Sequence, residues 1–199
     1  MKFYTETDRV EAFSDGVLAV IITIMVLELR PPDGTSIRSV VPALPTIAIY
    51  ALSFVLVGIY WNNHHHMLRA SRGVDGKAMW ANLHLLFWLS LVPFATAWLG
   101  RNPRDAGPTA LYAFILLLCA VAYAILQRTL VRVNGRGTPF ANALRYDAKG
   151  LVPLAIYAIA VGAAYISPFI SDVLIVGVAV LWFVPDRRLE PLIDASKKP

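Results

Sequence analysis

The four histidines are the residues of this chain best suited to binding a metal or moving a proton. Three are consecutive, His64, His65 and His66, and the fourth is His84. Neighbours on a helix point about 100° apart, so the run cannot hold one metal alone. His64 or His65 could instead approach His84 on another helix and supply two axial haem ligands. The run ends an apolar segment, where histidine often caps or snorkels, so a structural role is favoured and no metal is expected.

A carboxylate near the start of the first apolar segment is the second candidate for chemistry. Arg9 precedes Asp15 by six residues, about 240° around a helix, so the two do not pair comfortably within it. A buried charge needs hydrogen-bonding partners. The nearest ones are the Asn, His and Trp side chains of the next two segments, which predicts a polar network joining three helices. The expected partners are Trp61, Asn62, Asn63, His64, His65, His66, Asn82 and His84.

Asp15, Ser14 and the histidines also bear on two other kinds of function, proton transport and nucleophilic catalysis. Asp15 and the histidines could form the relay of a proton or small-solute transporter. A nucleophilic enzyme is not indicated, because Ser14 precedes Asp15 without a glycine elbow. The chain also lacks an HExxH, a Walker loop or a Gly-rich fingerprint, and it offers no soluble domain for a catalytic pocket. No enzyme activity is expected.

The composition is that of an integral membrane protein. Of 199 residues, 57% are hydrophobic and 16% are charged, against about a quarter charged in soluble domains. The mean hydropathy is +0.59. The single cysteine, Cys119, excludes a disulfide framework. The net charge of +5 comes from basic residues in loops beside apolar spans, so a nucleic-acid partner is not needed to explain it.

Six apolar segments are expected to be helices that cross the bilayer, which requires about 20 residues each. The polar amino terminus does not resemble a signal peptide, so the first segment is expected to stay in the protein. Pro93 is expected to kink the third span. Residues 1–185 are predicted to form one six-span transmembrane domain, followed by a polar cytoplasmic tail, 186–199. The spans are Arg9–Leu29, Val40–His66, Ala78–Leu99, Thr109–Val131, Gly150–Ile166 and Phe169–Val184.

Lysine and arginine set the predicted orientation. Six spans put both termini on one side of the membrane. That side holds fourteen of the 18 basic residues, and the other four are Arg30, Arg38, Arg101 and Arg104. Cytoplasmic loops carry the excess of basic residues, so both termini are predicted to be cytoplasmic.

An apolar stripe runs along the first span. On a helical wheel the stripe consists of Phe13, Val17, Val20, Ile24 and Leu27, with Thr23 on its flank and Asp15 on roughly the opposite side. Apolar faces of membrane helices usually contact lipid or other helices, and periodicity alone favours that interpretation.

The motif R-x-x-x-F-S-D, formed by Arg9, Phe13, Ser14 and Asp15, carries a resemblance to a known family. The segment RVEAFSDGVLAVIITIMVLEL resembles the signature first helix of the transmembrane protein 175 family of endosomal and lysosomal potassium channels, which has many prokaryotic members. The stretches YWNNHH and WANLHLLFWLSLVPFATAWLG are similar to the same family, and one copy of the motif is present.

The resemblance implies a specific architecture. Members with one six-helix unit per chain assemble as homotetramers, and the first helices line the pore without a loop-built filter. By position, the pore-facing layers would be Val20, Ile24 and Leu27, with a hydroxyl ring from Thr23 beside the narrowest layer. Arg9, Ser14 and Asp15 would set the tilt of this helix. Val20 is smaller than the aliphatic residue common at the first constriction.

These expectations combine into one functional hypothesis. A ring of aliphatic side chains dewets when it is narrow and closes the path to ions, and potassium sheds water more readily than sodium. We therefore expect an all-α, homotetrameric, weakly potassium-selective leak channel of the plasma membrane, with permeant K⁺ and no cofactor. Glu28 is placed near the outer mouth, where it would attract cations or contact headgroups or an interface. The alternatives are the transporter and the haem-binding anchor.

Overall fold

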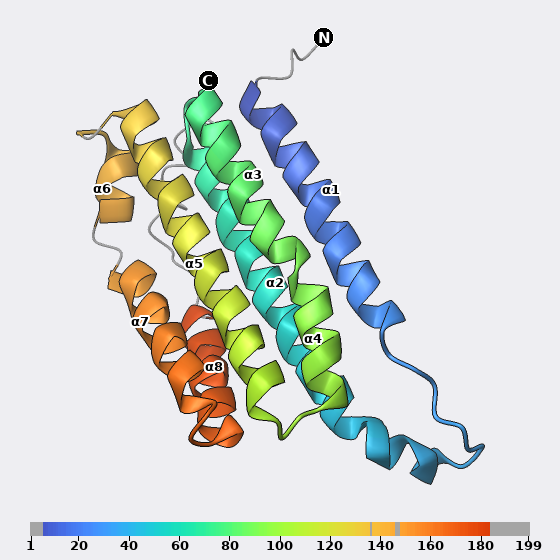
Figure 1. The fold of residues 1–199 in the computed structure, drawn as a ribbon. Coiled ribbons are helices and arrows are strands. Elements are labelled where there is room, and N and C mark those ends of the chain that lie inside the picture. The colour runs from blue at the N-terminus through green and yellow to red at the C-terminus, as the bar shows by residue number, and fades with distance from the viewer. Residues whose placement is uncertain (1–5, 136, 146–147, 184–199) are drawn as a thin grey trace.

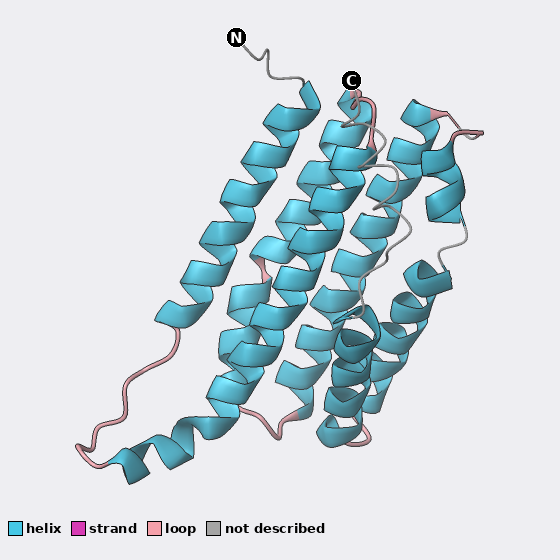
Figure 2. Ribbon diagram, turned by 180° about the vertical axis from the view of Figure 1, so that it is seen from behind, coloured by secondary structure: helices cyan, strands magenta, loops and turns pink. Residues whose placement is uncertain are grey.

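The computed structural model describes residues 6–135, 137–145 and 148–183, and every regular element in these ranges is a helix (Figure 1). The long helices run up and down beside one another in a single bundle, as the view from behind also shows (Figure 2). The predicted tail, 186–199, lies outside the described residues. The elements are α1 (Glu6–Leu27), η1 (Ile37–Ala43), α2 (Leu44–Ala70), α3 (Gly76–Ser90), α4 (Val92–Arg101), α5 (Ala106–Asn134), α6 (Pro139–Arg145), α7 (Ala148–Ala163) and α8 (Pro168–Phe183).

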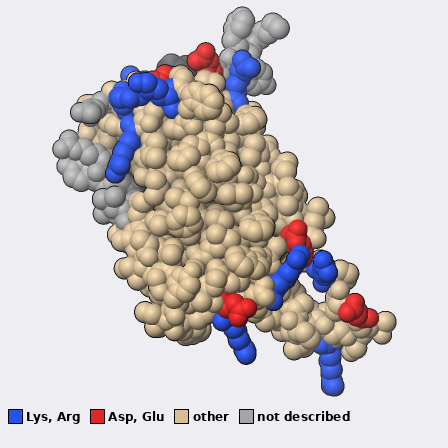
Figure 3. Space-filling view, in the orientation of Figure 1, with Lys and Arg blue, Asp and Glu red and all other residues tan. Residues whose placement is uncertain are grey.

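Four stretches of the described chain are long and apolar enough to cross a bilayer. They are Glu6–Leu27, Ile37–Ala70, Gly76–Arg101 and Ala106–Asn134. The two remaining apolar helices, α7 and α8, have 16 residues each. Lys, Arg, Asp and Glu gather at the two ends of the bundle and leave an uncharged belt between them on the face in Figure 3. The predicted all-helical membrane fold is therefore confirmed, whereas the count of six spans stays a prediction.

The third apolar stretch is interrupted close to the proline where a kink is predicted. Leu91 separates α3 from α4, and Pro93 occupies the first turn of α4. Proline has no N–H to continue the ladder of an incoming helix, but it fits the first turn of a new one. The break therefore falls two residues before Pro93. A second difference is α6, a short helix in the segment 132–149 between the fourth and fifth predicted spans, where no helix is predicted.

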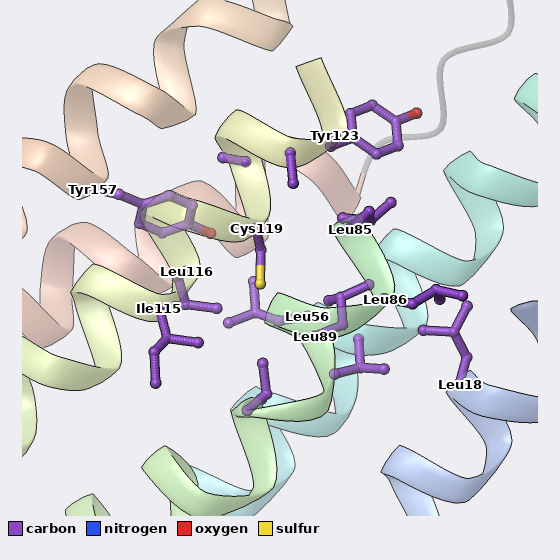
Figure 4. Close-up of a cluster of buried hydrophobic side chains, with 14 of the residues drawn as sticks. Leu18, Leu56, Leu85, Leu86, Leu89, Ile115, Leu116, Cys119, Tyr123 and Tyr157 are labelled. Carbon is purple, nitrogen blue, oxygen red and sulfur yellow. The ribbon is translucent and has the colours of Figure 1, made fainter. Parts of the chain in front are cut away.

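The core of the bundle is built around α5, which packs against α3, α4, α7 and α8. Leucines of α2 and α3 meet α5 around the thiol of Cys119 (Figure 4). Close approach of these helices is aided by small buried residues, Ala113, Ala120 and Ala122, on α5. Helix α1 lies at the edge of the bundle and packs against α2, α3 and α4 on one side only (Figures 1 and 2).

Candidate functional site: a polar network and an uncovered face on helix α1

Helix α1 has a covered face and an uncovered face. Leu18, Ile21 and Met25, spaced by three and four residues, are buried against the bundle, with Leu18 and Met25 each 1% exposed. Two aliphatic residues of the stripe, Val20 and Ile24, are instead 54% and 44% exposed in the single chain. Phe13 and Leu27 are also exposed, and Val17 is half-buried. Most of the apolar stripe is thus exposed on the surface of the single chain.

A buried hydrogen-bonded chain connects α1, α3 and α2. The amide nitrogen of Asn82 donates to the Ser14 hydroxyl at 2.9 Å, and that hydroxyl donates to the backbone carbonyl of Val10 at 2.7 Å. The amide oxygen of Asn82 is 2.7 Å from Nε2 of His64. Since this oxygen only accepts, Nε2 of His64 carries the hydrogen. Ser14, Asn82 and His64 are at most 2% exposed, so the chain is shielded from solvent.

Asp15 takes its partner from α2. The indole nitrogen of Trp61 donates to Oδ1 of Asp15 at 2.9 Å. Trp61 also stacks on the ring of His65, with centroids 5.8 Å apart. The carboxylate therefore lies on the α2 side of α1, away from the apolar stripe, and its partner belongs to the same chain.

Glu11, one turn before Asp15, forms the second contact between α1 and α2. Its Oε1 lies 2.8 Å from Nδ1 of His65 and 3.2 Å from Nε of Arg69. One ligand atom from each of Glu11, Asp15 and His65 lies within 4.8 Å of the others. This is the group of side chains in the described chain that could hold a metal ion.

Several residues expected in or near the network lie elsewhere. His84 accepts a hydrogen bond from the indole of Trp88, one turn along its own helix, at 2.9 Å. Arg9 makes no hydrogen bond or ion pair within the part of the chain that the structure describes. Arg9 and Phe13 instead line an open cleft of about 340 Å³ between α1 and α3, together with Met79. The structure thus brings together Ser14, Asn82 and His64, and separately Asp15 with Trp61.

The sequence interpretation missed Glu11 and Arg69. The signal that could have found Glu11 is its spacing of four residues from Asp15, which places both carboxylates on one face of the helix. Arg69 lies four residues after His65 on α2, so the same rule puts both opposite Glu11. Trp61 was named as a partner but not as a member of the site.

The polar groups near the other end of α1 are simpler. The Thr23 hydroxyl donates to the carbonyl of Val20 at 2.9 Å. Its hydrogen is thereby occupied, and the oxygen keeps its lone pairs outward. Glu28, just beyond the helix, forms an ion pair with Arg101 of α4 at 2.9 Å. An ion pair with α4 was not among the roles expected for Glu28.

The haem hypothesis required His64 or His65 to approach His84 across two helices. In the structure Nε2 of His64 is committed to Asn82, His65 faces Glu11, and His84 pairs with Trp88. Asn82 and Trp88 lie on α3, whereas Glu11 lies on α1. Each of the three rings therefore has a polar neighbour other than a histidine, and the haem hypothesis gains no support from the structure.

Comparisons with known proteins agree with one another. A family profile described as "Endosomal/lysosomal potassium channel TMEM175" matches residues 9–93. A potassium channel of Chryseobacterium sp. (strain P1-3) is 44% identical over 182 residues, covering 92% of this chain and 95% of the other. A potassium channel of Streptomyces collinus is 34% identical, covering 69% of this chain and 71% of the other. The crystal structure of a lysosomal potassium-selective channel TMEM175 homolog from Chamaesiphon minutus superposes with a TM-score of 0.77 at 26% identity, covering 91% of this chain and 98% of that one.

An all-helical bundle with four bilayer-length apolar stretches and charges confined to its ends is a multi-pass membrane protein, and its relatives are ion channels rather than enzymes. The chain belongs to the TMEM175 potassium channel family. The resemblance found in the motif of Arg9, Phe13, Ser14 and Asp15 is thereby confirmed.

Proposed function

We propose that this protein is a weakly potassium-selective leak channel, formed by four copies of the chain around a pore lined by α1. The observation that carries the proposal is the uncovered apolar stripe on an edge helix whose opposite side is buried in its own bundle. An apolar stripe of this kind could simply face the lipid of the bilayer. The names and the structural likeness of the relatives favour an axial position instead, with Val20, Ile24 and Leu27 as successive layers of the constriction.

The chemistry of these layers suits a gate for cations. Aliphatic rings repel water when they are narrow, so an ion crossing them must shed part of its hydration shell. The oxygen of Thr23, with its hydrogen directed to the Val20 carbonyl, presents lone pairs that replace some of the lost water. Potassium is more weakly hydrated than sodium, so such a neck favours potassium modestly. The permeant K⁺ is the only ion or cofactor that this function requires.

An ion pair lies at the outer entrance of the proposed pore. Arg101 lies beside Glu28 at the end of α1, so the carboxylate is largely neutralised and attracts cations weakly. With six spans, including the short α7 and α8, both termini are cytoplasmic and residues 1–185 form the channel domain. The excess of lysine and arginine on that side supports this orientation and a multi-pass location in the plasma membrane.

A transporter that relays protons through Asp15 and the histidines has less support. The buried chain from His64 through Asn82 and Ser14 ends on the backbone carbonyl of Val10, which has no proton to pass on. Asp15 belongs to a separate contact with Trp61. A relay would predict transport abolished by Asp15→Asn and insensitive to changes at Val20.

The test is cation flux into liposomes containing the purified protein, with potassium and sodium gradients compared and the oligomer mass measured in the same preparation. We expect tetramers that conduct potassium faster than sodium. A protein that stays monomeric in the bilayer, or that passes neither ion, contradicts the proposal.

A further inference from the structure

The contact between α1 and α2 carries a group of side chains that the channel function does not use. Glu11 and Asp15 lie one turn apart on α1, and His65 faces them from α2. One donor atom from each lies within 4.8 Å of the others. Two donor atoms bound to one tetrahedral zinc ion are about 3.4 Å apart. Side-chain rotations that move the donor atoms by roughly an ångström would therefore let all three bind the same ion.

The donor types select the class of ion. One imidazole nitrogen and two carboxylate oxygens suit Zn²⁺ and its first-row neighbours, whereas Ca²⁺ and Mg²⁺ prefer ligands that are all oxygen. Trp61 donates to Oδ1 of Asp15, and a carboxylate has two oxygens with lone pairs to spare. Three protein ligands leave the fourth position of a tetrahedral ion to water.

The imidazole of His65 provides an independent indication. Its Nδ1 is shielded from solvent and has no hydrogen-bond partner within the described residues, although Oε1 of Glu11 lies 2.8 Å away. The two atoms are close but are not aligned for a hydrogen bond. A shared cation would satisfy this nitrogen and the neighbouring carboxylate together.

Arg69 is the competitor of such an ion. Its Nε lies 3.2 Å from the same oxygen of Glu11, and its side chain is 51% exposed at the end of α2. An arginine at this place balances the carboxylates when no metal is bound. It also has room to turn toward solvent when a divalent ion arrives.

We propose that Glu11, Asp15 and His65 form a binding site for a divalent zinc-class cation, which ties α1 to α2 at the end of the bundle where α1 begins. The site departs from the sequence expectation of no metal. It does not depend on the channel assignment, because the tie is a property of one subunit. If α1 lines the pore, the tie holds the lining helix in place.

The test is binding of Zn²⁺ to the purified full chain in detergent, by equilibrium dialysis with metal analysis, and the visible absorption of Co²⁺ as a geometric probe. We expect one ion per chain, four-coordinate cobalt bands, and a higher thermal midpoint when Zn²⁺ is present. His65→Gln and Glu11→Gln should each weaken binding at least ten-fold, because losing even a residue that only supports a ligand typically costs about 10–100-fold in metal affinity and these two residues are the ligands themselves.

The most specific test is the variant Arg69→Gln. It removes the competing charge while the ligands stay in place, so it should tighten Zn²⁺ binding several-fold. His84→Gln, a histidine outside the cluster, is the matched control and should leave zinc affinity unchanged. Equal binding by the wild type and His65→Gln would mean an adventitious ion only and would overturn the proposal. Displacement of Co²⁺ by an equal concentration of Ca²⁺ would overturn the assignment of the ion class.

Discussion

The amide nitrogen of Asn82 donates to the hydroxyl of Ser14 across 2.9 Å, and this bond links α3 to the edge helix α1. Both side chains are buried, and the other end of the Asn82 amide is held by His64. A buried amide with both ends satisfied allows one arrangement of the three helices and penalises others. Together with the packing of Leu18, Ile21 and Met25, the bond therefore restricts the rotation of α1 about its own axis, and with it the direction in which Val20 and Ile24 point.

Removing the hydroxyl should loosen the bundle. Ser14→Ala leaves the Asn82 amide nitrogen buried without its acceptor, and we expect about 1–2 kcal/mol of lost stability. Unfolding followed by tryptophan fluorescence measures it. Ser90→Ala is the matched control, because the Ser90 hydroxyl is exposed and bonds only to the carbonyl of Phe87. Equal stability of the two variants would show that the Ser14 bond contributes nothing.

Replacing aliphatic side chains of the stripe with smaller ones should widen the proposed pore. Val20→Ala and Ile24→Ala widen an aliphatic neck, so we expect faster potassium flux or a lower preference over sodium in liposomes. Val26→Ala is the control, since Val26 is similarly exposed on the same helix but lies on the side away from the stripe. Flux that changes with Val26 and not with the stripe residues would place the pore elsewhere.

The Thr23 oxygen should raise the preference for potassium over sodium without changing the width of the proposed pore. Thr23→Val keeps the volume and removes the oxygen, so the ratio of potassium to sodium flux should fall while the tetramer stays intact. Thr23→Ser restores an oxygen and should restore most of the ratio. A ratio unchanged in both variants would leave the aliphatic layers as the whole source of selectivity.

Asp15 should matter for assembly more than for selectivity. Its carboxylate faces Trp61 on the side opposite the stripe, so Asp15→Ala removes the partner of a boundary indole and should reduce the yield of tetramer in size-exclusion chromatography. The tetramer that does form should select ions normally. Intact tetramers with altered selectivity would mean that Asp15 faces the pore.

Freeing Glu28 should increase cation entry. Arg101→Gln leaves the Glu28 carboxylate unpaired at the outer end of α1, and a few tenths of a kcal/mol of attraction corresponds to a roughly two-fold rise in potassium flux at low salt. The rise should vanish at high ionic strength because salt screens exposed charges. A rise that persists in high salt would point to a change in pore shape instead.

Much of the fold was predictable because hydropathy and the motif around Ser14 are strong signals. The apolar segments gave the helices to within a few residues, and the stripe on α1 separated Val20 and Ile24 from the buried Leu18. The polar partners were harder, because a wheel shows which side of its own helix a residue faces but not which neighbour faces it. Hence His84 was placed in the network although it bonds within α3, and Glu11 was overlooked although it meets His65.

The predicted helix boundaries differ from the structure where local backbone geometry determines them. A proline in an apolar stretch predicts a bend, but the sequence does not say whether the ladder survives, and here it ends at Leu91. The short α6 was missed because the segment from Arg132 to Lys149 is basic and polar, and a helix of seven residues has too few turns to show a period.

The interruption at Leu91 has a mechanical effect on the edge helix. Helix α1 packs against α3 near its beginning and against α4 near its end, and α3 and α4 are separate helices that meet at Leu91. The hydrogen bond between Ser14 and Asn82 holds the first half of α1 to α3, and the ion pair between Glu28 and Arg101 holds the chain just beyond α1 to α4. The angle between α3 and α4 therefore sets the relative positions of the supports at the two ends of α1.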